Sequence, residues 1–322
     1  MIDLFGKKKK AREKMESRYD IALGYYYGDG MLAQSYELAV DSFQKAIALG
    51  SVSAINFMGI CYREGNGVEQ DLKKAIELFL EAIDKGDKTY APNNLAACYE
   101  NGTGCEIDYA KSLKYFEMAS ENGNMPATND LGVKYKNGTG VEENQSKAFE
   151  YFQKASEAGM AIATYNLADY YRLGIVVEQD EKKAFECWKI SADAGIVPAI
   201  SNLGVAYEQG IGTEVDGNQA FLYYTLAASK EDYVAMNNLA LCYYHGIGSP
   251  VNAVSAFVLW SQAAAAGNID AQTSLGYCYA NGEGVAQDAE TGRYWLEKAA
   301  DAGSELAKKY LIGYGENNEE EN

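Results

Sequence analysis

Apolar residues recur along this chain at helical spacing and in nearly identical groups. Ala271, Leu275 and Tyr279 stand at positions i, i+4 and i+8, so they fall on one face of a helix. The same stripe recurs upstream, as Ala163-Leu167-Tyr171, Ala199-Leu203-Tyr207 and Ala235-Leu239-Tyr243. Each stripe predicts one amphipathic helix, and the recurrence predicts the same helix several times over.

A Gly-x-Gly motif follows each stripe at a nearly constant interval. No third glycine in register and no Lys-Ser/Thr pair follows Gly284, so the motif does not match a phosphate-binding loop. Successive first glycines are 36 or 37 residues apart, at Gly28, Gly65, Gly102, Gly138, Gly174, Gly210, Gly246 and Gly282. A fixed period of this length indicates a stacked repeat protein, in which Gly-x-Gly is a turn.

A second helix is predicted after each turn. Its start is marked by Asp or Asn, which are preferred N-caps worth about 1 kcal/mol each, at Asp71, Asp108, Asn144, Asp180, Asp216, Asn252 and Asp288. Bulky residues, then alanines and a closing glycine, follow in this second helix. Each unit therefore reads as helix A, a tight turn and helix B. A Gly or Ala also follows each helix A leucine, as Gly276 follows Leu275, and this predicts close approach of a neighbouring helix.

The whole pattern is A-x-x-x-L-G-x-x-Y-x-x-G-x-G-V-x-x-D-x-x-x-A, then aromatics, then A-A-x-x-G, with turns such as Gly65-Asn66-Gly67-Val68 and Gly138-Thr139-Gly140-Val141. It resembles the Sel-one-like repeat (SLR), a relative of the tetratricopeptide repeat. The resemblance implies an all-α, right-handed solenoid of repeats of about 36 residues that binds other proteins without catalysis. We expect a basic lead-in (residues 1–15), eight repeats (16–303), a capping helix (304–315) and an acidic disordered tail (316–322).

Two units depart from the pattern. Val176 replaces the second glycine of the fifth turn, and Lys230-Glu231 stands where the sixth unit should close with glycine. We expect a slightly altered joint between units at each place.

Charge and hydropathy limit the partners. The formal net charge is −18, which argues against phosphate-directed binding of nucleic acid and against anionic membrane surfaces. It suits a basic partner, although an acidic surface is also a common aid to solubility. No apolar run is long enough to span a membrane. Lys7–Lys10 follow only a short apolar patch, so the N-terminus does not read as a signal sequence; it reads as a lead-in, or alternatively as a localisation or membrane-touching patch.

Of the six cysteines, the four that share one slot indicate buried thiols, whereas Cys187 takes a bulky slot and Cys105 lies in a turn. The shared slot lies in helix A, next to the recurrent tyrosine, and holds Cys61, Cys98, Cys242 and Cys278. Cys98 and Cys105 flank one turn, and a disulfide between them stays open as an alternative. Some secreted SLR proteins carry one bridge per repeat, a pattern that is absent here. We therefore expect the reducing cytoplasm.

The sequence offers no catalytic or metal-binding constellation. His245 is the single histidine and has no identifiable carboxylate partner. No zinc-type spacing of Cys or His occurs, and acidic pairs fall on the repeating caps rather than at one place. We expect no enzyme activity, no metal and no cofactor.

One helix A slot, directly before the leucine, is polar in almost every repeat. This row, which we call the ladder, comprises Asn94, Asp130, Asn166, Asn202, Asn238 and Ser274. A partial row lies one residue earlier and includes Asn56, Asn93, Asn129, Tyr165 and Asn237. Amides both donate and accept hydrogen bonds, so the rows could hold the main chain of a peptide. The alternative is that they brace adjacent repeats.

The candidate partner-binding residues are accordingly Asn94, Asp130, Asn166, Asn202, Asn238, Asn56, Asn129 and Asn237. Helices A line the concave side of related solenoids, so the resemblance implies a scaffold or adaptor that takes a peptide or partner helix in the groove. The alternative is a regulatory subunit or effector-like protein that docks an enzyme through its termini or outer faces.

Overall fold

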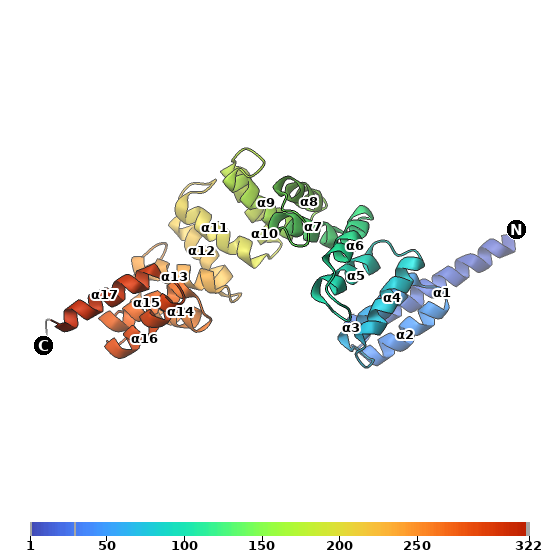
Figure 1. Ribbon diagram of the computed structural model, residues 1–322, viewed down its shortest axis with the longest axis horizontal. Coiled ribbons are helices and arrows are strands. Elements are labelled where there is room, and N and C mark those ends of the chain that lie inside the picture. The colour runs from blue at the N-terminus through green and yellow to red at the C-terminus, as the bar shows by residue number, and fades with distance from the viewer. Residues whose placement is uncertain (1, 29, 320–322) are drawn as a thin grey trace. The chain divides into compact units, whose positions relative to one another are not determined.

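The computed structural model describes residues 2–28 and 30–319, with side chains for residues 12–28 and 30–312, and every regular element in these ranges is a helix (Figure 1). Odd-numbered helices α1 to α15 are the A helices, and even-numbered helices α2 to α16 are the B helices. Their bounds are α1 Ile2–Tyr27, α2 Tyr36–Ala48, α3 Val52–Glu64, α4 Leu72–Asp84, α5 Tyr90–Asn101, α6 Tyr109–Glu121, α7 Met125–Asn137, α8 Gln145–Glu157, α9 Ala161–Leu173, α10 Glu181–Asp193, α11 Val197–Gln209, α12 Gly217–Ala228, α13 Tyr233–His245, α14 Ala253–Ala265, α15 Ile269–Asn281, α16 Ala289–Asp301 and α17 Glu305–Glu319. The predicted all-α solenoid is confirmed.

The chain forms two compact units, residues 1–160 and residues 161–322. Within each unit, every helix packs against the helix before it and the helix after it in the sequence. Contacts are therefore local, as expected where no single helix pair can bury its own apolar face.

The B helices begin where the sequence predicts. Asp71, for example, has extended backbone torsions, and its Oδ1 accepts a hydrogen bond of 2.9 Å from the backbone N–H of Lys74. All seven predicted Asp and Asn residues cap in this way, and Ser35 caps α2. Each cap satisfies an N–H group that would otherwise lack a partner at the helix start.

The Gly-x-Gly motif is a turn that also permits repeat-to-repeat contact. Gly282 ends α15 with a φ of 74°, in the left-handed region that favours glycine. Gly284 has a φ of 71°, and a Cβ atom there would lie 2.2 Å from the carbonyl oxygen of Ala253, in the preceding repeat. At this turn a side chain in place of the second glycine would therefore collide with the preceding repeat, and the motif acts as a turn rather than a phosphate-binding loop.

One large B-helix side chain per repeat fills the core. These residues are Phe43, Phe79, Phe116 and Phe152 in the first unit, and Trp188, Tyr224, Trp260 and Leu296 in the second, and all are buried. They pack on the Gly/Ala slot of helix A: a Cβ atom on Gly132 would lie 2.6 Å from Cε1 of Phe152. The predicted close approach is confirmed.

Both departures from the repeat pattern adopt the backbone of the glycine they replace. Val176 has a φ of 56° and Glu231 a φ of 63°, and they are the two non-glycine residues with positive φ in the described chain. The N–H of Glu231 donates to the carbonyl of Ala228 at 3.0 Å, as Gly267 does to Ala264. The altered joint that we expected at Glu231 is therefore not seen in the backbone hydrogen bonds, because the residue takes the left-handed conformation instead.

The terminal helices differ in extent from the expected boundaries. Helix α1 begins at Ile2, so the lead-in of residues 1–15 is helical backbone apart from Met1, which lies outside the described residues. Helix α17 continues through residues 316–319, where we expected the start of the disordered tail. Glu316 and Glu319 are good helix formers and no proline intervenes, which favours this continuation. Residues 320–322 lie outside the described residues.

Candidate functional site

The two polar rows differ in how far they reach the surface. The ladder residues Asn94, Asp130, Asn166, Asn202 and Asn238 are half-buried on the A helices. In the partial row, Asn56, Asn129 and Asn237 expose only 3%, 7% and 6% of their surface. A ligand can therefore reach the ladder directly, whereas these three residues of the partial row lie between helices.

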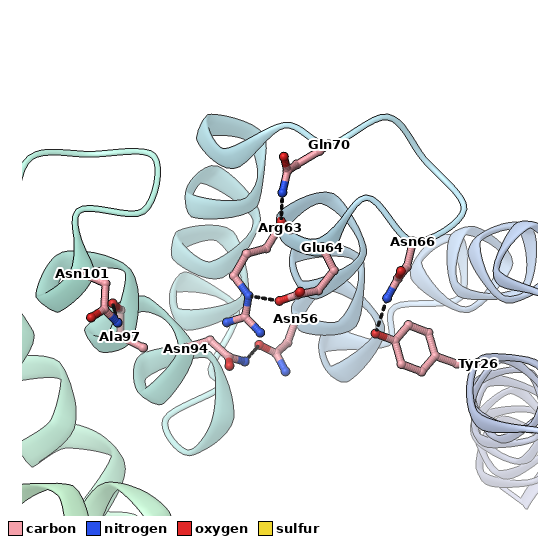
Figure 2. Close-up of polar contacts among 9 residues, drawn as sticks. All are labelled: Tyr26, Asn56, Arg63, Glu64, Asn66, Gln70, Asn94, Ala97 and Asn101. Atoms are coloured by element: carbon pink, nitrogen blue, oxygen red, sulfur yellow. Dashed lines mark hydrogen bonds and ion pairs between the residues drawn. The ribbon is translucent and has the colours of Figure 1, made fainter. Parts of the chain in front are cut away.

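In the first unit, the two rows meet across neighbouring A helices. Nδ2 of Asn94, on α5, donates a hydrogen bond of 2.9 Å to Oδ1 of Asn56, on α3 (Figure 2). Figure 2 also shows Asn66 in the following turn, whose Nδ2 donates to the Tyr26 hydroxyl at 3.0 Å. These side chains tie one repeat to the next.

Farther along the same unit, a charged group of residues interrupts the repeat. Asn129 donates a hydrogen bond to the Asp130 carboxylate, whose pKa is raised, mainly because burial penalises the charged form. Beside them, Lys134 of α7 forms an ion pair with Glu100 of α5. Lys134 is only 4% exposed, which is unusual for a charged side chain.

In the second unit, the partial row serves a buried tryptophan. Nε1 of Trp260, on α14, donates to Oδ1 of Asn237 at 3.1 Å, and Nδ2 of Asn237 donates to Oδ1 of Asn238 at 3.3 Å. Asn237 thus satisfies an indole N–H that would otherwise be unpaired in the core.

Two further ladder residues contact tyrosine hydroxyls in the same unit. Asn238 donates to the hydroxyl of Tyr224, which itself donates to Glu208 at 2.6 Å; burial and Glu208 both raise the pKa of this tyrosine. Asn202 of α11 donates to the hydroxyl of Tyr165 on α9. Bracing between helices is therefore a property of Asn94, Asn202 and Asn238. An amide has two N–H groups and a carbonyl, so one such contact uses only part of its capacity.

The surface has hollows of two kinds. A wide hollow of about 730 Å³ lies at the turns of the fifth and sixth repeats. Its lining includes Asp180, Glu181 and Glu214 but no ladder residue. A smaller cavity of about 240 Å³ contains the ladder residue Asn202 together with Trp188. The smaller cavity is therefore the hollow relevant to the ladder.

The groups with potential reactivity do not converge. His245 is exposed at the end of α13 and makes an edge contact with Tyr244. All six cysteines are free, so Cys98 and Cys105 are not bridged, and burial raises the pKa of Cys61 and Cys98 to about 11. Among the described residues, no cluster of His, Cys, Asp and Glu could hold a metal ion. Over the same residues, the helices are too short or too polar to cross a bilayer.

Sequence reasoning missed Lys134 and Trp188. Lys134 occupies the slot that holds Cys61, Cys98, Cys242 and Cys278 in other repeats. Trp188 occupies the ordinary bulky slot, but Tyr165 replaces the asparagine that serves Trp260 two repeats later. In both cases the sequence carries a sign of the difference, which is one substitution at a repeating position. It becomes visible only when the equivalent positions of all repeats are compared.

These features define a class: an α-solenoid built from helix pairs, of the kind typically used as a protein-interaction scaffold. The sequence profile of the Sel1 repeat matches eight segments, residues 16–51, 52–87, 90–124, 126–160, 161–196, 197–232, 234–268 and 269–304. The chain belongs to the Sel1 repeat family, whose members are generally protein-interaction scaffolds.

Two solved structures show the same architecture. A protective antigen of uropathogenic Escherichia coli strains, with an SLR fold, is 28% identical, with a TM-score of 0.78; the match covers 94% of this chain and 66% of the antigen, so this chain spans just under two thirds of its length. A Sel1 repeat protein from Oxalobacter formigenes is 27% identical, with a TM-score of 0.68, covering 95% and 90% of the two chains. No curated protein matches the chain by sequence.

Proposed function

We propose that this chain is an adaptor that holds an extended peptide or a partner helix against its A helices. The proposed contacts are the ladder residues Asn94, Asp130, Asn166, Asn202 and Asn238. The supporting observation is that half-buried polar side chains recur every 36 residues above buried leucines, such as Leu203 and Leu239 in the second unit. The buried residues Asn56, Asn129 and Asn237 act in this proposal by orienting the ladder.

The chemistry of the ladder favours recognition of a main chain. Asn166, Asn202 and Asn238 present the same amide group from α9, α11 and α13, and an amide pairs with either the N–H or the carbonyl of a peptide bond. Such contacts do not depend on the partner's side chains. The ladder therefore sets where a segment lies, and other cavities set which segment is preferred.

The charge of the chain favours a basic partner over nucleic acid. The net charge is −18, and the ladder itself includes the carboxyl group of Asp130. Opposite charge on a partner speeds encounter, whereas phosphate backbones are repelled. We also place the protein in the cytoplasm, since its six thiols are free and reducing compartments maintain free thiols.

A substitution taken from the protein's own repeats tests the proposal. The eighth repeat carries Ser274 in the ladder slot, so Asn166→Ser, Asn202→Ser and Asn238→Ser together shorten the ladder in a way that the fold already accepts. The matched control changes three exposed polar residues of B helices, Asn218→Ala, Thr225→Ala and Gln262→Ala. Partners are captured from the native lysate on the immobilised chain and on both variants.

The expected result is one partner that binds the parent and the control but is lost from the ladder variant, while circular dichroism shows unchanged helicity. Retention by the ladder variant would contradict the proposal and leave bracing as the role of the ladder. Loss of the partner on deletion of residues 1–15, with the ladder variant still binding, would favour docking through the terminus instead.

A further inference from the structure

Two equivalent tryptophans in the second unit differ in how their indole N–H groups are satisfied. Trp188 and Trp260 occupy the same B-helix slot, 72 residues apart. The N–H of Trp260 donates to Asn237, but the corresponding residue beside Trp188 is Tyr165. Trp188 is only 3% exposed, and none of the described residues accepts a hydrogen bond from its Nε1. A buried donor without an acceptor is costly, so this position calls for an explanation.

The unpaired N–H belongs to a side chain that lines the cavity of about 240 Å³. The cavity lies between α9 and α11, and its polar lining consists of Asp169, Arg172, Asn202 and Gln209. The Arg172 guanidinium is 3.1 Å from the Asp169 carboxylate, and both side chains are partly exposed. Ligand clefts for drug-sized molecules occupy about 300–1,000 Å³, so this cavity is of a size for one side chain.

The lining combines donors and acceptors without net charge. Arg172 has five N–H donors and Asp169 has about four acceptor sites, and their ion pair uses only a few of these. Trp188 lines the cavity and carries the unpaired donor, which is covered in the free protein, and Asn202 and Gln209 add amides. A group that both accepts and donates, and carries no charge, is complementary to this set.

We propose that the cavity over Trp188 is a subsite for the side-chain carboxamide of a glutamine in the partner segment. Its carbonyl oxygen accepts from Trp188 and Arg172, and its NH₂ group donates to Asp169. The inference rests on the proposed function, because the cavity contains the ladder residue Asn202 and the segment held by the ladder would present the glutamine.

Competing side chains fit less well. A carboxylate would face Asp169 and a chain of net charge −18, and an ammonium group could not accept from the indole. An apolar side chain would leave the Trp188 N–H unpaired. Nε1 itself is covered in the free protein, so a neighbouring side chain must move before the carboxamide reaches it.

Indole NMR tests this directly, because the chain has three tryptophans and so three indole N–H signals. The probe is N-acetyl-glutamine methylamide, with the glutamate and leucine analogues as controls. The variants Trp188→Phe and Trp260→Phe assign the signals by loss. The Trp188 signal should move with a dissociation constant of about 1–100 mM for a fragment of this size. Binding should be about tenfold weaker for each control, the equivalent of one hydrogen bond, and the Trp260 signal should stay in place.

Equal binding of the three probes, or no movement of the Trp188 signal, overturns the subsite. Stronger binding of the glutamate analogue also overturns it and indicates a carboxylate site. These outcomes are separate from failure of the proposed function: a partner lost from the ladder variant, together with a silent Trp188 signal, would keep the adaptor and remove the subsite. If Trp188→Phe does not fold, Trp260→Phe and Trp295→Phe assign the Trp188 signal by elimination.

Discussion

Lys134 and Glu100 form an ion pair between two neighbouring A helices, α7 and α5, in the interior of the first unit. The Lys134 ammonium nitrogen also lies 5.0 Å from the centroid of the Phe116 ring. In the other repeats this slot carries small or apolar groups: Cys61, Cys98, Tyr170, Ala206, Cys242 and Cys278. One repeat therefore contains a buried charge where its neighbours have none.

We expect Glu100→Gln to lower the free energy of unfolding by about 1–3 kcal/mol. Breaking a buried pair leaves an uncompensated charge, which typically costs about 3–5 kcal/mol, and the value is discounted because Glu100 is 29% exposed. Urea unfolding followed by circular dichroism measures the loss. Adding Lys134→Cys, the residue of four other repeats, removes the stranded charge and should restore most of the stability. A Glu100→Gln variant as stable as the parent would show that the pair contributes nothing.

Asp130 should make stability depend on pH in a direction opposite to that of a salt-bridged carboxylate. Its pKa is raised by burial, so the native state binds its proton more tightly than the unfolded state does. The contribution of this proton to the free energy of unfolding is fully present below the pKa that Asp130 has in the unfolded chain. It is lost as the pH rises through the higher pKa that Asp130 has in the folded protein. Asp130→Asn, which matches the ladder, should therefore be more stable than the parent at pH 7, with a gain that disappears in acid. Thermal midpoints across pH 3–8, each compared with the parent, measure the difference; a gain that grows in acid would contradict the assignment.

The helix pairs were predictable from sequence because each is determined by local rules repeated many times. Asp71 and Asp288 cap helices through side-chain oxygens, and Gly282 ends a helix through its own torsion; neither effect needs a distant contact. Recurrence in register then identifies the stack.

The details of the candidate site were not predictable because they depend on pairs of residues about 23 to 38 positions apart. The bond from Asn94 to Asn56 and the bond from Trp260 to Asn237 both join residues whose slots are known but whose side-chain directions are not. Successive residues of a helix point about 100° apart, so two adjacent positions face different surroundings. A small error in the assumed direction therefore decides whether an asparagine is expected to contact a neighbouring helix or the solvent. The ladder was thus locatable, and its bracing contacts were not.

Gly132→Ala should destabilise the first unit although alanine is the better helix former. A Cβ atom there would meet Cε1 of Phe152 at 2.6 Å. Overpacking costs about 1–3 kcal/mol, against a gain of up to about 1 kcal/mol in helix propensity, so we expect a net loss of up to about 2 kcal/mol in the free energy of unfolding, measured in urea. Combining it with Phe152→Leu, which removes the opposing ring, should make the alanine less costly than it is alone. An additive double variant would show that the two positions do not contact.

Val176→Gly should stabilise the second unit, by about 1 kcal/mol. A β-branched side chain at a φ of 56° is strained, and a left-handed residue with a Cβ atom costs about 1–2 kcal/mol. Part of that relief is offset because glycine loses more backbone freedom on folding. The matched control is Val285→Gly, in the same kind of turn: Val285 lacks a positive φ and packs on the core, so its loss should destabilise. A higher thermal midpoint for Val176→Gly together with a lower one for Val285→Gly would establish that backbone strain dominates over side-chain packing at Val176. A lower midpoint for Val176→Gly would contradict this, because it would show that the contacts of the valine side chain outweigh its strain.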